Sequence, residues 1–398
     1  MASGNTGARV LGVGMCPFET PRRARTYDAM AEEAIRAALA DAGVELGDVQ
    51  QIFAGYVYGD STSGQNAVYR VGLPGVPVVN VNNNCSTGSS ALWAARQAVE
   101  YGAAECVLAV GFEQMRPGAL VAHWDDRPTP FQRFDDTALQ IGGIPEDVPM
   151  AARFFGGAGM AYAERYGTEP ETFASITVKA RAHAAHNPNA VFRDPLTVRE
   201  VLDSPTVFGT LTRLQCCPPT CGAAAAIICS PEFADRHGLN APVEIAAQSM
   251  TTDQPISFDP PDPINLVGYD MTARAAAEVY AASGVEPTDI PVVELHDCFT
   301  PNELISYEAL GLTPTGTAEK FVRDGDNTFG GQTVVNPSGG LLAKGHPLGA
   351  TGLAQCAELV WQLRGQAGAR QVERANLALQ HNIGLGGACV VTLYRTVR

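Results

Sequence analysis

Cys85 stands where a thiol could act as a nucleophile. The run VPVVNV before it predicts a buried strand, and a helix with apolar residues at core spacing from Ala91 to Val99 follows. A thiol at a helix N-terminus feels the positive end of the helix dipole, so we expect a pKa below the usual value of about 8.5. Backbone N–H groups at the same end could hold an oxyanion. A lone cysteine in such a place is more often simply a buried residue, so a catalytic role for Cys85 requires a nearby base.

His346 is the candidate base. It lies in the Gly-His-Pro turn of NPSGGLLAKGHPLGATG, which opens a second helix equivalent to the one after Cys85. If two halves of the chain pack around a pseudo-twofold axis, both helix N-termini face one site. A neutral imidazole there could take the proton from Cys85, as in other Cys–His pairs. The alternative is a histidine that only caps its turn.

Two further motifs place polar side chains at the ends of predicted strands. His296 and Cys298, in HDCF, follow the apolar run VVEL, while His381 and Asn382, in QHNIG, end the run NLALQ. Ligands of doubly wound sheets bind at the carboxyl ends of the strands. Gly384 and the glycines after it allow close approach of the backbone, although they could equally belong to a strand with close neighbours.

The elements that must position these residues occur twice. A predicted helix over 29–42, the linker GVELGDV and the strand VQQIFAGYV recur as a helix over 272–283, the linker GVEPTDI and the strand PVVELHDCF. In each half a turn rich in glycine or asparagine then leads into a long helix and a strand. This order predicts an α/β fold with a duplicated architecture.

The predicted domains follow from this repeat. Residues 1–117 and 201–237 form the N-terminal half, and residues 238–398 form the C-terminal half. The stretch 118–200 has no counterpart in the second half, so we expect an inserted loop domain there.

The composition limits the class of protein. The chain has 398 residues, of which 45% are hydrophobic and 17% charged, enough apolar material for a large core. A formal net charge of −15 argues against nucleic acid as a partner, because neutralising phosphates requires clustered Lys and Arg. The sequence has neither a secretory leader nor an apolar run of about 18 residues, so no membrane association is expected. The ten cysteines fit a reducing compartment.

Other cysteines and histidines are given structural roles. Cys216, Cys217 and Cys221 match no common zinc spacing and are predicted to be buried structural thiols. His183 and His186 stand three residues apart on a predicted helix without an adjacent acidic or thiol partner, and we expect them on the surface. No metal site is predicted.

Four segments together carry a family resemblance: NVNNNCSTGSS, HDCF, NPSGGLLAKGHPLGATGLAQCAELVWQLRG and LQHNIGLGGA. They resemble, in order and over nearly the whole chain, the sterol carrier protein-2 type thiolases of the thiolase superfamily. The resemblance implies the thiolase fold, in which duplicated βαβαβαββ halves form a five-layered α-β-α-β-α core with an inserted loop domain.

The resemblance also implies roles for the residues of the four segments. Cys85 becomes the nucleophile that accepts the acyl group, and His346 becomes its activating base. Cys298 becomes the acid and base that protonates the leaving carbanion and deprotonates CoA, because ordinary thiolases carry their second cysteine where this chain has His381 and Asn382. His381 and Asn382 then have supporting roles in the active site.

Two oxyanion holes are implied in the same way. His296 would hold a water that, with His346, stabilises the enolate oxygen of the thioester. The backbone N–H groups of Cys85 and Gly384 would hold the tetrahedral oxyanion at the reacting carbonyl.

The implied activity is that of an acyl-CoA C-acyltransferase, a 3-oxoacyl-CoA thiolase. It would cleave 3-oxoacyl-CoA with CoA to acetyl- or propanoyl-CoA and a shortened acyl-CoA, through an acyl-cysteine in a ping-pong mechanism, in fatty-acid or sterol side-chain degradation. CoA is then a substrate, and no cofactor is expected. The alternatives are a retro-aldolase of the same fold, whose known forms lose the catalytic cysteines, and a non-catalytic lipid-binding or scaffold subunit.

The expected assembly is a homodimer or a dimer of dimers. Family members pair through their central sheets, and the apolar run Ala388–Leu393 near the end of this chain is taken as further support. We expect a free-standing cytoplasmic enzyme, because LYRTVR carries neither a lipid-carrier domain nor a peroxisomal tripeptide.

Overall fold

A computed structural model describes residues 7–116, 124, 126–142 and 148–397. The described residues form one ten-stranded sheet in the order β10-β9-β11-β12-β8-β1-β7-β4-β2-β3. The strands of its first half are β1 (Arg9–Met15), β2 (Gln51–Gly55), β3 (Val78–Val81), β4 (Cys106–Glu113) and β7 (Gly222–Cys229). Those of its second half are β8 (Val243–Thr251), β9 (Val292–Glu294), β10 (Val334–Val335), β11 (Leu377–Gly384) and β12 (Ala388–Thr396). A separate hairpin joins β5 (Thr206–Phe208) and β6 (Leu211–Thr212).

The two halves of the sheet have the same topology. The first runs β3-β2-β4-β7-β1, and the second runs β10-β9-β11-β12-β8. In each half the first three strands are parallel and the last two run antiparallel to their neighbours. The duplication predicted from the sequence is therefore confirmed. The halves join through a short antiparallel contact of β1 with β8, where Arg9 faces Glu244 and Val10 faces Val243.

The linkers predicted as equivalent also adopt the same structure. Helix α1 (Tyr27–Ala42) ends at Gly43 with φ 69°, and α10 (Tyr269–Ser283) ends at Gly284 with φ 68°. This left-handed conformation favours glycine. A single 3₁₀ turn follows in each linker before the next strand.

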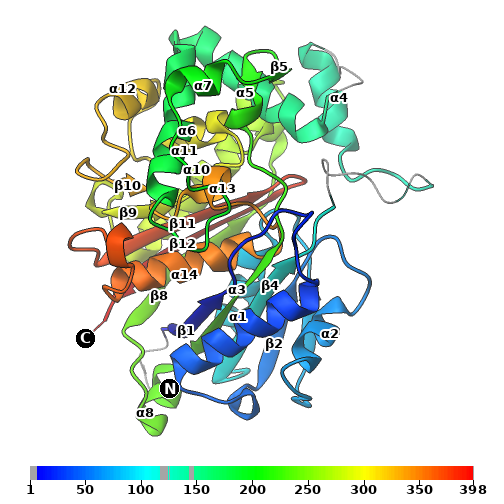
Figure 1. Ribbon diagram of the computed structural model, residues 1–398, viewed down its shortest axis with the longest axis vertical. Helices are drawn as coiled ribbons and strands as arrows, with labels where there is room; N and C mark the ends of the chain where they lie inside the picture. The colour runs from blue at the N-terminus through cyan, green and yellow to red at the C-terminus, as the bar shows by residue number, and fades with distance from the viewer. Residues whose placement is uncertain (1–6, 117–123, 125, 143–147, 398) are drawn as a thin grey trace.

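Two equivalent helices form the middle layer of the fold. Helices α3 (Thr87–Glu100) and α14 (Thr351–Leu363) pack against each other, and each contacts strands of both half-sheets, while α1 and α10 cover the outer faces. Figure 1 shows α14 in orange between the red strands of the second half and the blue first half. The succession helix, sheet, helix, sheet, helix is the predicted five-layered core.

Glycines let the beginnings of the two central helices touch. A Cβ at Gly88 would lie 2.7 Å from the carbonyl oxygen of Gly349, and a Cβ at Gly352 would lie 2.3 Å from the backbone nitrogen of Ser89. Larger residues would separate the two helix N-termini, so these glycines bring the segments that carry Cys85 and His346 together.

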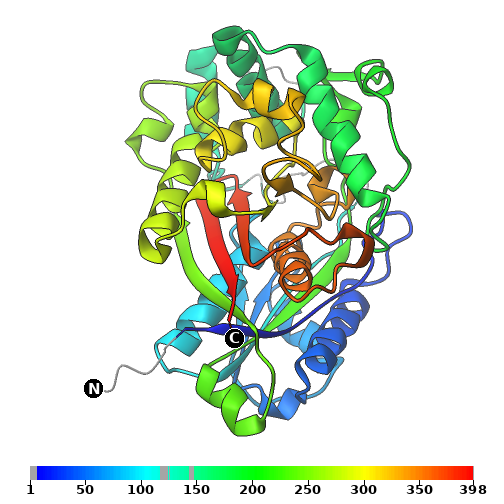
Figure 2. The same cartoon turned by 90° about the vertical axis from the view of Figure 1, so that its left-hand side faces the viewer.

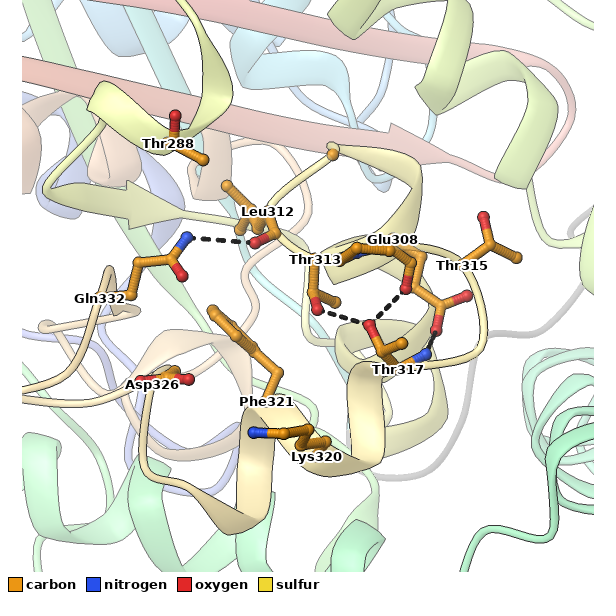
Figure 3. Close-up of a pocket in the computed structure, with 12 residues that line it drawn as sticks. Thr288, Glu308, Leu312, Thr313, Thr315, Thr317, Lys320, Phe321, Asp326 and Gln332 are labelled. Carbon is orange, nitrogen blue, oxygen red and sulfur yellow. Dashed lines mark hydrogen bonds between the residues drawn. The ribbon is translucent and has the colours of Figure 1, made fainter.

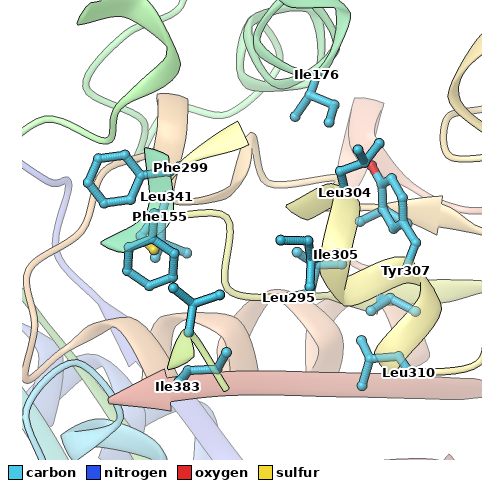
Figure 4. Close-up of a cluster of buried hydrophobic side chains, with 14 of the residues drawn as sticks. Phe155, Ile176, Leu295, Phe299, Leu304, Ile305, Tyr307, Leu310, Leu341 and Ile383 are labelled. Carbon is cyan, nitrogen blue, oxygen red and sulfur yellow. The ribbon is translucent and has the colours of Figure 1, made fainter. Parts of the chain in front are cut away.

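The predicted insert packs on the second half. Its helices α4 (Gln132–Ile141), α5 (Met150–Tyr166) and α6 (Pro170–Ala184) share one hydrophobic core with α10, α11 (Thr300–Ala309) and β11. In Figure 4, Phe155 of α5 lies against Phe299, and their ring centroids are 5.0 Å apart. Residues 118–123, 125 and 143–147 of this insert lie outside the described residues, and the division into domains stays a prediction.

The run Ala388–Leu393 is not a free surface. It belongs to β12, which is paired with β11 on one side and with β8 on the other, and its side chains are buried. Figure 2 shows the two red strands beside green β8, inside the molecule. The use of this run as support for dimerisation is therefore wrong. The edge strands of the described sheet are β10, whose residues are buried, and β3, where Val79 is 41% exposed. In the described part of the chain, no helix is long and apolar enough to cross a membrane.

Candidate active site

Cys85 lies in a tight turn between β3 and α3. Asn84 has φ 50°, and the backbone nitrogen of Ser86 donates to the carbonyl of Asn83, so the chain reverses within a few residues. The hydroxyl of Thr87, the first residue of α3, donates to the carbonyl of Asn84 at 2.6 Å. The turn holds the Cys85 thiol at the start of the helix, as the sequence predicts.

Three predicted residues from three segments converge. The sulfur of Cys85 and one ring nitrogen each of His296 and His346 lie within 4.8 Å of one another. The two imidazole rings meet edge to face, with centroids 5.1 Å apart. His346 is 5% exposed and His296 is 1% exposed, so the cluster is nearly closed to water. These groups could exchange a proton or hold an oxyanion between them.

Thr351 decides which nitrogen of His346 carries the proton. The Thr351 hydroxyl lies 3.0 Å from the carbonyl of Pro347 and 2.7 Å from Nδ1 of His346. The Pro347 carbonyl only accepts, so when the single hydroxyl proton goes to Pro347, Nδ1 of His346 donates to Thr351. Nε2 then carries the free lone pair, and it has no hydrogen-bond partner among the described residues. This nitrogen can act as a base.

Two side chains of the first half hold the loop that carries His346. The Thr220 hydroxyl accepts from the backbone nitrogen of His346. The Glu113 carboxylate, 1% exposed, accepts from Gly349 at 3.1 Å and also from Val57 and Tyr58. Burial raises the pKa of Glu113 to about 7. Sequence reasoning missed Thr220 and Glu113, since each acts through a contact with a distant segment. It also missed Thr351, which lies only five residues after His346.

The expected low pKa of Cys85 is not what the structure gives. Burial raises the pKa of this thiol to about 12, and the nearby Glu113 carboxylate adds to the rise. The cost of placing a thiolate in a site with so little water outweighs the favourable end of the helix dipole. Burial also lowers the pKa of His346 to about 3. The resting pair is therefore a neutral thiol beside a neutral imidazole.

Cys298 lies near the cluster and beside an unexpected third thiol. Burial raises its pKa well above the ordinary value, and the neighbouring thiols of Cys217 and Cys85 add to the rise. The backbone of Cys217 donates to the carbonyl of Cys298 at 2.8 Å, next to an antiparallel bridge between Cys216 and Phe299. Cys217 and Cys298 thus face each other across two antiparallel segments. The prediction of buried structural thiols is wrong for Cys216 and Cys217, which are partly exposed.

The QHNIG segment surrounds the site from β11. Asn382 contacts Nδ1 of His296 through its side-chain amide at 2.9 Å. His381 points to Thr272 instead, at 3.0 Å, and burial lowers its pKa to about 3. A Cβ at Gly384 would lie 2.1 Å from the carbonyl oxygen of Asn83, so only glycine lets this strand approach the turn that carries Cys85.

The surface position expected for two other histidines holds for only one of them. His183 is buried, and its ring nitrogens contact the carbonyl of Asn336 and the hydroxyl of Thr328, so its predicted surface position is wrong. His186 is exposed, as predicted.

A surface cavity of about 640 Å³ lies elsewhere, between α11 and α12 (Ala318–Arg323). Figure 3 shows Glu308, Thr313 and Thr317 joined by hydrogen bonds along its wall. None of Cys85, His296, Cys298 or His346 lines it. Its location gives it no part in the chemistry of the cluster.

The sequence matches two protein-family models over most of its length. A model described as thiolase, N-terminal domain, covers residues 10–232, and one described as thiolase C-terminal domain-like covers residues 263–393. Sterol carrier protein 2 of Rattus norvegicus is 53% identical over 390 residues, which are 97% of this chain and 71% of the relative.

Two further comparisons differ in what they suggest. An acetyl-CoA acetyltransferase of Methanothermobacter thermautotrophicus is 35% identical over 375 residues, 92% of this chain and 93% of that protein. The solved structure of an Ltp2–ChsH2(DUF35) aldolase matches with a TM-score of 0.83 at 26% identity, covering 99% of this chain and 98% of that one.

Proposed function

Because this chain belongs to the thiolase family, we propose that it is an acyltransferase that cleaves 3-oxoacyl-CoA with CoA by way of an acyl-Cys85 intermediate. The observation that carries the proposal is the convergence of the Cys85 sulfur with ring nitrogens of His296 and His346 within 4.8 Å. The products are acetyl- or propanoyl-CoA and a shortened acyl-CoA.

The first half-reaction begins with a proton transfer. Nε2 of His346 takes the proton of Cys85 as the sulfur bonds to C3 of the substrate, so a free thiolate is never needed in the dry site. The N–H groups of Cys85 and Gly384 hold the oxyanion on C3. As the bond between C2 and C3 breaks, its electron pair passes to C2 and the thioester oxygen. His296, through a water, and the protonated His346 stabilise that oxygen, and the Cys298 thiol protonates C2.

The second half-reaction transfers the acyl group. The Cys298 thiolate takes the proton of incoming CoA, whose sulfur attacks the carbonyl of the Cys85 thioester. The bond from this carbonyl to the Cys85 sulfur breaks, and Cys85 recovers its proton from His346. A raised pKa suits Cys298 for this cycle, because it keeps the thiol protonated until a carbanion is present.

Aldolase chemistry is the second candidate, and the match to the Ltp2–ChsH2(DUF35) aldolase is the observation that favours it. A retro-aldol cleavage removes a proton from a hydroxyl group and protonates a carbanion, and it needs no acyl-enzyme. The presence of both Cys85 and Cys298 supports the thiolase reaction instead. A non-catalytic lipid-binding or scaffold subunit would need neither thiol.

One assay separates these candidates. The protein is given either a 3-oxoacyl-CoA with CoA, followed by the loss of the enolate absorbance of this substrate, or a 3-hydroxyacyl-CoA. Intact-protein mass spectrometry after brief incubation with acyl-CoA shows whether an acyl adduct forms. We expect turnover and a single acyl adduct that is absent from Cys85→Ala. Cleavage of a 3-hydroxyacyl-CoA without an adduct would support the aldolase, and no reaction with either substrate would support the non-catalytic subunit.

We also propose that the protein assembles as a homodimer through the open edge of β3. Val79 of β3 is 41% exposed, and the segment that leads into this strand carries two further exposed apolar side chains, Tyr69 at 52% and Leu73 at 81% exposure. An exposed apolar edge strand offers unpaired backbone groups to another strand. A second copy of β3 would satisfy them and continue the sheet.

A further inference from the structure

A chain of buried hydrogen bonds leads from the middle of the fold to His296. It passes from Gln380 to Ser89, from Ser89 to Asn382, and from Asn382 to the imidazole. Gln380, Ser89 and Asn382 are all fully buried. They come from β11 and α3, so the chain spans both halves of the duplicated fold.

The direction of the chain is set at Gln380. Its side-chain nitrogen lies 2.7 Å from the carbonyl of Gly352 and 2.8 Å from the hydroxyl oxygen of Ser89, while its side-chain oxygen accepts from the hydroxyl of Tyr394. A carbonyl can only accept, so the NH₂ group of Gln380 must face Gly352. Its second proton then points to Ser89, which accepts it.

Ser89 passes this direction to Asn382. Since the Ser89 oxygen accepts from Gln380, its single proton is available for donation, and Oδ1 of Asn382 lies 2.8 Å away. If the amide of Asn382 were turned round, two NH₂ groups would face the Ser89 oxygen and the hydroxyl proton would lose this acceptor. The oxygen of Asn382 therefore faces Ser89, and its NH₂ group donates to Nδ1 of His296 at 2.9 Å.

We propose that Ser89, Gln380 and Asn382 are positioning residues that hold the proton of His296 on Nε2, so that this nitrogen is a fixed hydrogen-bond donor in the site. A neutral imidazole has one proton, and an Nδ1 that accepts leaves it on Nε2. His346 has the opposite arrangement, because Thr351 keeps its proton on Nδ1. The cluster thus contains one donor and one base from two identical side chains.

The functional part of this inference rests on the proposed thiolase reaction, in which His296 must donate toward the enolate oxygen. The tautomer itself does not depend on that reaction. It also affects what else the cluster can bind, because a ring nitrogen that carries a proton cannot coordinate a metal ion. A Cys, His, His cluster within 4.8 Å would otherwise suit zinc.

Asn382→Asp tests the proposal, because a carboxylate only accepts and draws the proton of His296 to Nδ1. Ser89→Ala is the second variant, since it frees the Asn382 amide to turn. Ser90→Ala is the matched control for the tautomer: Ser90 is a buried serine on the same helix, and it donates to the carbonyl of Ser86 and accepts from the side-chain amide of Asn83, both outside the chain of bonds.

The first measurement is nuclear magnetic resonance of isotopically labelled imidazole nitrogens in the full chain, with the His296 signals assigned by their loss in His296→Asn. We expect a protonated Nε2 and a bare Nδ1 in the wild type and in Ser90→Ala, and a protonated Nδ1 in Asn382→Asp. A wild-type His296 protonated on Nδ1 would overturn the proposal, whatever the activity.

The second measurement is kinetic. In Asn382→Asp we expect kcat for 3-oxoacyl-CoA to fall by about 10²- to 10³-fold with KM little changed, the usual effect of removing one oxyanion donor. Zinc alone, followed by calorimetry, should bind this variant about 10- to 100-fold more tightly than the wild type, as carboxylate–histidine pairs do. If the wild type has the expected tautomer but no thiolase activity, the proposed function fails and the positioning role stands. Unchanged kcat in Asn382→Asp with a shifted tautomer would overturn the link to catalysis.

Discussion

The imidazole rings of His296 and His346 cross at 86° with their centroids 5.1 Å apart, and their hydrogen-bond partners place their protons on opposite nitrogens. Burial lowers the pKa of His346 to about 3 and that of His296 well below the ordinary value. Both rings therefore stay neutral at physiological pH. In the resting site the two rings therefore differ in the position of their protons, and His346 becomes charged only when it takes the proton of Cys85.

The reactivity of Cys85 should increase steadily with pH. Because its pKa is raised to about 12, the thiolate fraction grows about tenfold per pH unit from pH 6 to 9, while His346 stays neutral above pH 3. Glu113, with a pKa of about 7, gains its charge in this range and makes the rise shallower there. Iodoacetamide labelling of Cys85, measured by peptide mass spectrometry, should show no plateau. A plateau above pH 8 would instead support the low pKa that the helix dipole favours.

Thr351→Val should impair the first half-reaction. Valine keeps the shape but accepts no hydrogen bond, so Nδ1 of His346 loses the partner that leaves Nε2 unprotonated. We expect acylation of Cys85 to slow by about 10²-fold, within the usual contribution of a positioned base. Thr351→Ser keeps the acceptor and is the control. Equal rates for the valine and serine variants, measured by rapid-quench mass spectrometry, would remove Thr351 from the mechanism.

Cys298→Ala should separate the two half-reactions. Acylation of Cys85 by an acyl-CoA should persist in part, because it uses His346. Turnover of 3-oxoacyl-CoA should fall by about 10²- to 10⁴-fold without a proton donor for C2.

His381→Ala is the comparison, and a smaller loss is expected because His381 points to Thr272. Full activity of Cys298→Ala together with an inactive His381→Ala would move the proton shuttle to β11. If Cys298→Ala keeps substantial activity, Cys217→Ala in the same background identifies whether the facing thiol replaces it.

Val79→Lys should shift the assembly toward monomer. Val79 is 41% exposed on the open edge of β3, and a charge there opposes the pairing of two edges. Analytical ultracentrifugation at micromolar concentration should find a dimer for the wild type and a larger monomer fraction for the variant. Leu139→Lys is the control, since Leu139 is 58% exposed on α4, away from this edge. A wild-type monomer near 41.9 kDa would contradict the proposal.

The sequence alone was sufficient for the order of elements. The repeated linkers GVELGDV and GVEPTDI predict equivalent glycine-capped helices, and Gly43 and Gly284 do adopt the same left-handed conformation. The turn NNNCSTG and the motif GHP likewise indicate where Cys85 and His346 stand, because turns, caps and apolar periodicity are local properties. That the two segments meet was an inference from the duplication.

The tertiary structure decided the electrostatics and the partners. The dipole argument for Cys85 used only local sequence, whereas burial from all sides raises the pKa of the thiol, and burial depends on residues far along the chain. Glu113 reaches Gly349, and Ser89 reaches Asn382, only after the halves have packed. The run Ala388–Leu393 was taken as support for dimerisation because the sequence of an apolar strand does not show whether its neighbours belong to its own chain or to another. Protonation states and interfaces depend on long-range neighbours, which local patterns do not contain.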